Sequence, residues 1–421
     1  MAMQLASLLF VFLSTSADDP ADWGWLHGPN GNRTTSETVG LRKWPREGPP
    51  RLWRTGTPGG FSSLAVADGK AFTLILRDDK EVCIALNTAN GKELWGAPLG
   101  NAKYDGGGAA GADDNKGGDG PRSTPSCYEG RVYVLDAHLL LTALDAEDGS
   151  EVWRQDLMAD HGGRNIRWQN AASPLIADGR VYVAGGGAGN SLLAFDAKSG
   201  EPIWATGDER MTHATPVMAR IHGVEQVLFL VQAGLVALDP RTGDELWRTE
   251  YPYRTSTAAS PVVYEDLVYL SAGYGVGAGV FRVEKDGDEW QLSNVWRKRN
   301  RLMNHWSTPV CRDGFLYGMF SFKKYGDGPL MCVDMRTGEE RWSQAGFGPG
   351  NCILVGDEVL ALSDTGEIVL VAAVPDEYRE IERADVLKGK CWSSPSFSNG
   401  QLYVRSTVEA TRVDLSRPLR R

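Results

Sequence analysis

Six residues with chemically versatile side chains precede a recurring segment in which small residues, often with a Pro, lead into an apolar run. They are Arg122, Asn170, His213, Thr257, His305 and Trp392, with Phe61 and Asn304 nearby. Cationic, amide and aromatic groups on a rigid scaffold are typical of a ligand-binding mouth. Imidazole can also ligate a metal or shuttle protons. We therefore predict that these residues contact a ligand if the fold brings them together.

The chain carries none of the common catalytic motifs. It has no H-E-x-x-H, no G-x-x-x-x-G-K-[ST] and no G-x-S-x-G with triad partners. The run GGGAGN at Gly185–Asn190 precedes no helical pattern, so we interpret it as a hairpin turn and not as a phosphate loop. We assign no catalytic residue and favour binding over catalysis, since neither a triad nor a metal-ligand spacing supports a reaction.

Metal and thiol chemistry have weak support in the sequence. Asp113, Asp114 and Asp119 lie in the Gly-rich stretch Asn101–Gly120 and could offer oxygens to Ca²⁺, but their spacing is not that of an EF-hand. We favour a flexible loop as the interpretation of this stretch over a Ca²⁺ loop. A third interpretation is a lid over the top face of the fold. The six Cys residues form no C-x-x-C, no C-x-x-C-H and no adjacent pair, which argues against zinc-ribbon and haem sites. Burial as small apolar side chains is expected, with no disulfide pairing predicted.

The segment that follows each of the six residues predicts an innermost strand. Small residues suit a crowded axis, and Pro is tolerated at the start of a strand. Seven copies are present, at Phe61–Leu74, Arg122–Leu135, Asn170–Ala184, His213–Met218, Ala258–Ser271, Trp306–Met319 and Trp392–Val404.

A second repeat predicts a hairpin. It reads A-L-D-x-x-T-G-x-x-x-W in outline, with an Asp or Asn that starts a turn, a Gly in the positive-φ position and a Trp on the returning strand. We expect these Trp side chains to pack between neighbouring sheets and not to bind a cofactor. The Gly residues are Gly91, Gly149, Gly200, Gly243 and Gly338, and the Trp residues are Trp95, Trp153, Trp204, Trp247 and Trp342.

The spacing of the repeats predicts an all-β propeller. The five Trp residues are separated by 58, 51, 43 and 95 residues, and periods of about 40–50 residues are typical of four-stranded blades. Gly350–Ala373 fills a gap as a degenerate copy, and Val280–Trp296 departs from the Trp spacing. We predict eight four-stranded antiparallel blades, with seven as the alternative.

The N-terminal residues divide into three parts. Residues 1–17 contain a short apolar run followed by small residues, which resembles a signal peptide and predicts export to the periplasm or outside the cell. Residues 18–50 form a polar leader with interspersed Trp, expected to pack across the propeller. Residues 51–421 form the propeller itself, and a strand near residues 51–56 is expected to complete the last blade and close the ring.

Charge and hydropathy narrow the range of partners. The net charge is −10, which argues against general binding to nucleic acid or anionic membranes, and no run is long enough to span a bilayer. We expect a monomer whose partner is a protein, a small molecule or a glycan at the propeller axis.

The repeated A-L-D-x-x-T-G-x-x-x-W unit resembles the pyrroloquinoline-quinone (PQQ) repeat. The resemblance extends over nearly all of the chain after residue 20 and implies one of two branches: eight-bladed quinoprotein dehydrogenases that hold PQQ and Ca²⁺ on the axis, or non-catalytic propellers similar to BamB. The enzymes typically carry an adjacent Cys pair that is missing here, and BamB carries a lipid-anchoring Cys that is missing too. The expected function is thus a non-catalytic, cofactor-free extracytoplasmic scaffold, and a reduced quinoprotein dehydrogenase with PQQ and Ca²⁺ is the alternative.

Overall fold

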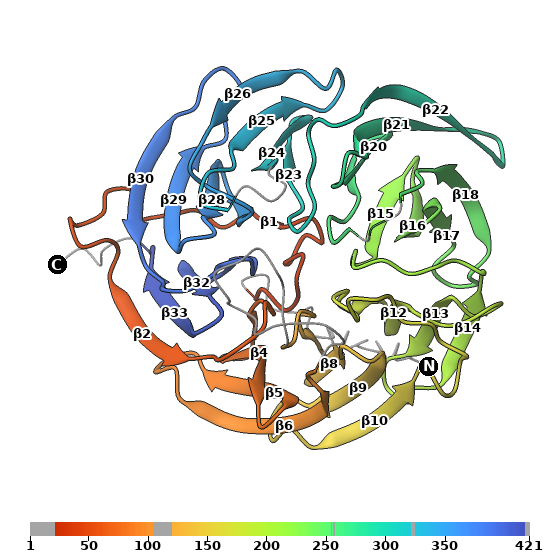
Figure 1. The fold of residues 1–421 in the computed structure, drawn as a ribbon, viewed down its shortest axis with the longest axis horizontal. Coiled ribbons are helices and arrows are strands. Elements are labelled where there is room, and N and C mark those ends of the chain that lie inside the picture. The colour runs from red at the N-terminus through yellow and green to blue at the C-terminus, as the bar shows by residue number, and fades with distance from the viewer. Residues whose placement is uncertain (1–21, 104–119, 254, 256, 321–324, 417–421) are drawn as a thin grey trace, which may run out of the picture.

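The computed structural model describes residues 22–103, 120–253, 255, 257–320 and 325–416. Regular structure in these ranges consists of β-strands alone, grouped into eight sheets around one axis (Figure 1). Seven sheets have four strands, and the eighth has a fifth strand added at its inner edge. The prediction of an eight-bladed antiparallel propeller is confirmed, and the seven-bladed alternative is wrong.

Blades 1 to 4 are each built from four successive strands, numbered from the axis outward. Blade 1 consists of β3 (Ala65–Ala67), β4 (Lys70–Arg77), β5 (Lys80–Asn87) and β6 (Glu93–Asn101), and blade 2 of β7 (Ser126–Tyr128), β8 (Arg131–Leu135), β9 (Leu140–Asp145) and β10 (Glu151–Asp156). Blade 3 consists of β11 (Leu175–Ala177), β12 (Arg180–Ala184), β13 (Leu192–Asp196) and β14 (Pro202–Thr206), and blade 4 of β15 (Val217–Ile221), β16 (Val224–Val231), β17 (Gly234–Leu238) and β18 (Glu245–Glu250).

Blades 5 to 8 follow the same order, with the two N-terminal strands added to the last two blades. Blade 5 consists of β19 (Val262–Tyr264), β20 (Leu267–Ala272), β21 (Gly277–Asp286) and β22 (Glu289–Lys298), and blade 6 of β23 (Val310–Arg312), β24 (Phe315–Met319), β25 (Leu330–Asp334) and β26 (Glu340–Gln344). Blade 7 consists of β27 (Asn351–Val355), β28 (Glu358–Leu362), β29 (Glu367–Ala372) and β30 (Glu380–Asp385), with β1 (Thr34–Thr35) added. Blade 8 consists of β31 (Ser396–Ser398), β32 (Gln401–Arg405) and β33 (Glu409–Asp414), with β2 (Arg51–Gly56) as its outer strand.

A ladder of hydroxyl groups joins the blades around the axis. The backbone N–H of Ser63 donates to Thr124 Oγ1 at 2.9 Å, and Thr124 N–H donates in turn to Ser173 Oγ at 2.9 Å. Equivalent bonds of 2.8–2.9 Å link Ser173 to Thr215, Ser260 to Thr308 and Ser394 to Ser63. In five of the eight blades, the Ser or Thr before the inner strand thus satisfies a buried donor of a neighbouring blade, which would otherwise cost about 1–3 kcal/mol.

In six of the eight seams between blades, a Trp side chain binds one blade to the next by a repeated hydrogen bond. Trp95 Nε1 donates to the Ala146 carbonyl at 3.2 Å, in the hairpin of the following blade. Further bonds of the same kind run from Trp53 to Thr88, Trp153 to Ala197, Trp204 to Pro240, Trp296 to Met335 and Trp342 to Val374, at 2.7–3.0 Å. Each indole therefore buries apolar area and also satisfies its polar N–H.

The Gly of each hairpin lies directly under the Trp of the preceding blade. Gly91, Gly149, Gly200, Gly243 and Gly338 all have φ between 70° and 77°. A Cβ on any of them would lie 2.6–2.8 Å from the Trp ring atoms. The turn conformation and the close approach both require Gly.

Two seam tryptophans were not among the predicted repeat. Trp53 on β2 and Trp296 on β22 occupy this position for blades 8 and 5, although the A-L-D…W spacing misses both. Trp247, which the spacing includes, is buried but donates its Nε1 to Gln226 Oε1 at 2.7 Å within its own blade. The hairpin of blade 5 lacks the repeat, so it offers this indole no equivalent turn.

The ring closes where the first and last parts of the chain meet in blade 8. Strand β2 pairs antiparallel with β33, and Arg54 pairs with Thr411 in that register. Buried Arg405 joins blade 8 to blade 1 through the hydroxyl of Thr73 and the carbonyls of Leu74, Thr57, Gly59 and Ser406. Closure leaves no exposed sheet edge between blade 8 and blade 1.

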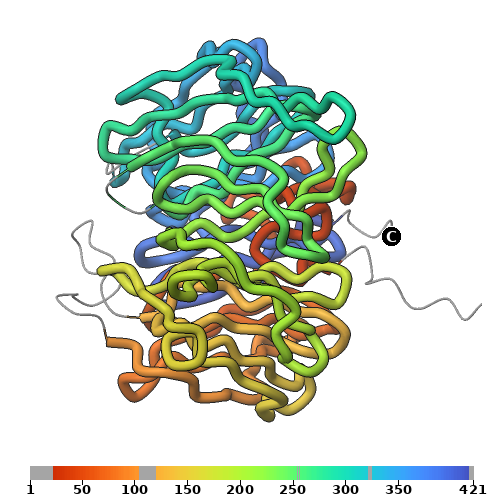
Figure 2. The backbone as a smooth tube through the Cα atoms, turned by 90° about the vertical axis from the view of Figure 1, so that its right-hand side faces the viewer, coloured from red at the N-terminus to blue at the C-terminus, as the bar shows by residue number. Residues whose placement is uncertain are grey.

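The leader crosses the axis on one face. Trp23 forms a bridge to Val66 at the end of β3, and further along β1 pairs parallel with β27, so that Thr34 lies opposite Leu354. Figure 2 shows this N-terminal segment, in red, against one side of the disc. The leader therefore bridges the inner ends of blades 1 and 7.

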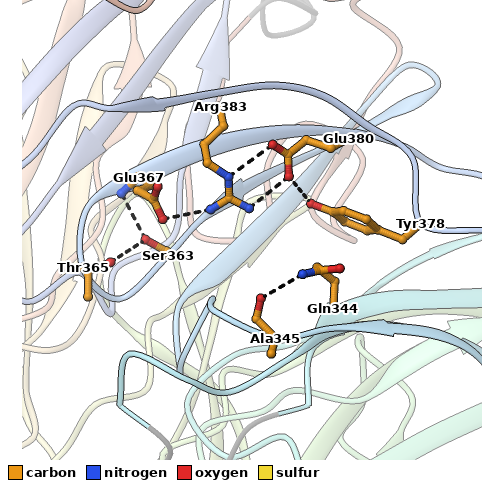
Figure 3. A network of polar contacts seen from close by, with 8 residues as sticks. All are labelled: Gln344, Ala345, Ser363, Thr365, Glu367, Tyr378, Glu380 and Arg383. Atoms are coloured by element: carbon orange, nitrogen blue, oxygen red, sulfur yellow. Dashed lines mark hydrogen bonds and ion pairs between the residues drawn. The ribbon is translucent and has the colours of Figure 1, made fainter.

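Blade 7 is stabilised differently from the others, since its hairpin lacks the repeat Gly and its outer strand lacks the Trp. Arg383 on β30 lies between Glu367 on β29, at 2.9 Å, and Glu380, at 3.0 Å (Figure 3). Tyr378 donates to Glu380 and its ring packs edge-on against Trp342 at 5.4 Å.

Across the described residues, no helix has the length and apolar character to cross a membrane.

Candidate functional site

The axis has two ends that differ in composition. The inner strands run from the face carrying the segments before them, which we call the upper mouth, to the face covered by the leader, which we call the lower mouth. The hydroxyl ladder forms the narrow part between them. All six predicted ligand-contact residues lie in the segments that lead into inner strands at the upper mouth.

Stacked aromatic rings form one wall of the upper mouth. The rings of Phe61 and Trp392 lie 4.9 Å apart with 26° between their planes, and Trp392 and Trp306 lie 4.6 Å apart at 12°. The three residues come from the segments before blades 1, 8 and 6. Trp392 is buried, whereas Phe61 and Trp306 are half-buried, so parts of these two outer residues are accessible to solvent.

A cation and a buried carboxyl adjoin this stack. The ammonium of Lys390 lies 4.7 Å from the centre of the Trp392 ring and 5.6 Å from that of Tyr325, within the range of cation–π attraction. Asp364 Oδ2 accepts a hydrogen bond from the Gly326 N–H at 2.8 Å. Burial raises the pKa of Asp364 to about 6, although the positive charge of Lys390 opposes the shift.

The two predicted histidines lie near each other at the same mouth. His213 Nε2 lies 2.7 Å from the Gln169 carbonyl, so this nitrogen carries the proton and donates. Burial, together with the charges of Arg122 and His305, lowers the pKa of His213 to about 3. His305 packs edge-on against Trp306 at 5.0 Å and Tyr274 at 5.2 Å. His213 is therefore neutral at pH 7.

The other predicted residues divide into two kinds. Arg122 Nη1 donates to the Trp168 carbonyl at 2.7 Å, which ties its guanidinium to the neighbouring blade's loop. Asn170 and Asn304 are buried and donate to backbone carbonyls, and Thr257 Oγ1 donates to the Ser271 carbonyl at 3.4 Å. The structure thus brings Arg122, His213, His305 and Trp392 together at the mouth, while the amides and Thr257 hold the surrounding loops.

Sequence reasoning missed three residues of this mouth: Trp306, Lys390 and Asp364. A signal for Trp306 was available, because the segments WSTP and WSSP place Trp306 and Trp392 at equivalent positions. Lys390 and Asp364 lie in blade 7 and the segment after it, where the repeat is degenerate.

The thiols and carboxylates of the described residues bear on the alternative with PQQ and Ca²⁺. All six Cys residues are single thiols, and burial raises the pKa of five of them. The described ranges contain no group of three His, Cys, Asp or Glu side chains placed to hold a metal ion. Asp113, Asp114 and Asp119 lie outside the described residues.

Comparison with known proteins identifies relatives of two kinds. Residues 78–344 match the profile of the PQQ-repeat family described as outer membrane protein assembly factor BamB. BamB of Moranella endobia is 25% identical over 262 residues, 58% of this chain and 63% of the relative. Quinohemoprotein alcohol dehydrogenase ADH-IIG of Pseudomonas putida is 29% identical over 140 residues, 31% of this chain and 19% of the relative. The chain spans less than two thirds of the length of both relatives.

Among solved structures, the quinohemoprotein alcohol dehydrogenase of Comamonas testosteroni superposes with a TM-score of 0.65. The match covers 95% of this chain and 81% of the other at 15% identity. At this identity the likeness concerns the fold alone, which hosts both kinds of relative.

Proposed function

Because the chain belongs to the PQQ-repeat family described as outer membrane protein assembly factor BamB, we propose that it is a non-catalytic extracytoplasmic scaffold that binds a protein partner at its upper mouth. The observation that carries the proposal is the aromatic stack of Phe61, Trp392 and Trp306. Large, rigid and partly exposed aromatic rings are common anchors of protein interfaces.

Of the polar groups beside the stack, His213 is unsuited to proton transfer, and Asp364, with a pKa of about 6, is the group whose pKa lies nearer neutrality. A general base works best with a pKa near the pH of the reaction. His213, with a pKa of about 3 and its Nε2 proton donated to a carbonyl, is a poor base at pH 7. Lys390 and Arg122 supply positive charge, so the preferred partner is a segment with an aromatic or Pro side chain next to a carboxylate.

Location and assembly state belong to the same proposal. A periplasmic or secreted location agrees with the resemblance of residues 1–17 to a signal peptide and with a relative whose name places it in outer-membrane assembly. A monomer is proposed because a propeller leaves only short, protected strand edges for self-association.

Site-specific photo-crosslinking tests the scaffold. A benzoylphenylalanine at Phe61 is expected to crosslink to a partner in the periplasm, whereas one at Trp290, on the outer strand β22, is not. Trp306→Ala in the Phe61-labelled chain is expected to reduce the product at least tenfold, and Trp290→Ala is expected to leave it unchanged. Equal crosslinking at both positions, or no loss with Trp306→Ala, would contradict the proposal.

The alternative, a dehydrogenase that uses PQQ and Ca²⁺, is tested with purified protein. Mixing with PQQ and Ca²⁺ is expected to produce no quinone absorbance on the protein after gel filtration. Tight quinone binding together with alcohol-dependent dye reduction would defeat the scaffold proposal.

A further inference from the structure

Arg33, in the leader at the lower mouth, is a buried cation with neutral partners. One of its Nη atoms donates to Asn351 Oδ1 at 3.0 Å and to Ser394 Oγ. Within the part of the chain that the structure describes, no carboxylate forms an ion pair with this guanidinium and its Nε has no acceptor. Burial lowers the pKa of Arg33 to about 10, which leaves it charged at pH 7.

Arg405 shows what a purely structural buried arginine looks like in the same fold. Its Nε, Nη1 and Nη2 all donate, to four carbonyls and to the Thr73 hydroxyl. Arg405 also lacks a carboxylate, but each of its nitrogen atoms has an acceptor. Arg33 differs from it because one buried donor is left over.

His27 adds a second group with unused hydrogen-bonding capacity. It is only 2% exposed, and neither ring nitrogen has a partner among the described atoms. Burial and the nearby charge of Arg33 lower the pKa of His27 to about 3, so the ring is neutral with one N–H donor at pH 7. An unpaired buried donor costs about 1–3 kcal/mol, and native proteins retain few of them.

Both residues line one cavity of about 200 Å³ between the leader and the inner strands of blades 4 to 6. The leader side is polar, with His27, Arg33 and the amides of Asn30 and Asn32. The opposite side is mixed: apolar residues, among them Val217, Ala219 and Val262, lie beside Arg220, Glu265 and Thr308.

The turn that presents these groups is rigid. Gly28 has φ of 68°, and a Cβ there would lie 2.6 Å from the Trp23 ring. Arg33 also has positive φ, 66°, and its N–H donates to the His27 carbonyl at 2.6 Å. The polar wall is thus fixed in place before any ligand arrives, which reduces the entropy lost on binding.

We propose that this cavity is a binding site for a small monocarboxylate with a short apolar chain, distinct from the upper mouth. The carboxylate accepts hydrogen bonds from the guanidinium of Arg33 and the N–H of His27, and its carbon chain packs against the apolar residues of the opposite side. A guanidinium is suited to a carboxylate by the geometry of its donors. A phosphate or sulfate fits less well, since it carries no carbon chain and would leave Val262 and Pro309 without an apolar partner.

Thermal unfolding of the full-length protein with sodium butyrate tests the site. Ligand at about ten times its Kd is expected to raise Tm by about 2 °C in a saturable way, with sodium chloride matched for ionic strength. Calorimetric titration with butyrate is expected to give one site per chain. Sodium phosphate is expected to give no saturable rise.

Three variants make the result specific. Arg33→Met removes the charge and is expected to abolish the butyrate effect. Ala219→Leu narrows the cavity from the opposite side without altering Arg33 and is expected to weaken it at least tenfold. Arg51→Gln removes an exposed charge on β2, outside the cavity, and is expected to leave it unchanged.

Two results would overturn the proposal. One is the absence of saturable stabilisation of the wild-type protein by butyrate, and the other is equal stabilisation of wild type and of Ala219→Leu. If Arg33→Met fails to fold, the Ala219→Leu comparison decides alone. Stabilisation by phosphate but not by butyrate would refute the carboxylate class.

Discussion

Gly149 and Gly130 have nearly the same backbone conformation but different surroundings. Their φ angles are 75° and 72°; a Cβ at Gly149 would lie 2.6 Å from the Trp95 ring, while one at Gly130 would meet nothing within 4 Å. We predict that Gly130→Ala costs about 1 kcal/mol of unfolding free energy, from the positive φ alone. Gly149→Ala is expected to cost about 1–3 kcal/mol more because it overpacks the seam.

Urea unfolding of the two variants and the wild type measures this difference. Equal losses of unfolding free energy would show that the seam yields to an added methyl group, and would contradict the role given to the Trp–Gly contact.

Asp364 predicts a pH dependence of stability. Because burial raises its pKa from 3.8 to about 6, the folded state holds this proton more tightly than the unfolded state does. The resulting stabilisation is complete below about pH 4 and is lost as the pH rises through about 6. Asp364→Asn removes the effect, so its unfolding free energy relative to wild type should rise by up to about 3 kcal/mol between pH 4 and 7.

The measurement is urea unfolding of both proteins at pH 4, 5, 6 and 7. Asp376→Asn, at an exposed carboxylate, is the matched control and should show no trend of this size. A difference between Asp364→Asn and wild type that stays constant with pH would rule out a raised pKa at this position.

At the scale of elements, β2 determines whether the ring is closed. Without it, β33 would present unpaired N–H and C=O groups to solvent. We predict that a chain beginning at Thr57 self-associates, and that a peptide of residues 48–58 restores the monomer by pairing with β33. Light scattering with and without the peptide checks this prediction.

A chain beginning at Asp22, which retains β2, is the control and should remain monomeric. A monomeric Thr57 chain with unchanged Tm would show that closure depends on side-chain packing between blades and not on the β2 strand.

How far the sequence predicts these elements depends on what each residue must satisfy. The Gly and Trp of a hairpin are fixed by one turn and one contact, so their spacing repeats and predicts the blades. The A-L-D…W spacing does not detect Trp53 or Trp296. Trp53 lies on β2, which does not follow a hairpin, and Trp296 lies on β22, which with β21 forms a longer hairpin of two ten-residue strands. The same contact is made from a different register, which a fixed spacing cannot detect.

The candidate site was less accessible to such reasoning. The residues before the inner strands lie at one mouth, but which of them face solvent depends on neighbouring loops. Asn170 and His213 both precede an inner strand, yet Asn170 donates to three carbonyls and is fully enclosed, whereas His213 is half-buried. The lower cavity depends on where the leader crosses the axis, which no repeat specifies.

For the whole molecule, a net charge of −10 predicts weak attraction to polyanions. We expect no cosedimentation with vesicles that contain anionic lipid at about 150 mM salt, where screening acts over about 8 Å. Vesicles of neutral lipid are the control. Binding to the anionic vesicles alone would reveal a local basic surface that outweighs the overall charge.

The pairing of β2 with β33 has a consequence for synthesis of the chain. Arg51 pairs with Val413, so the first outer strand is made long before its partner exists. At about 5–20 residues per second, this delay lasts roughly 20–70 s. During that interval the nascent chain carries an unmatched β-segment, and a holding chaperone that recognises extended backbone would have its main opportunity there.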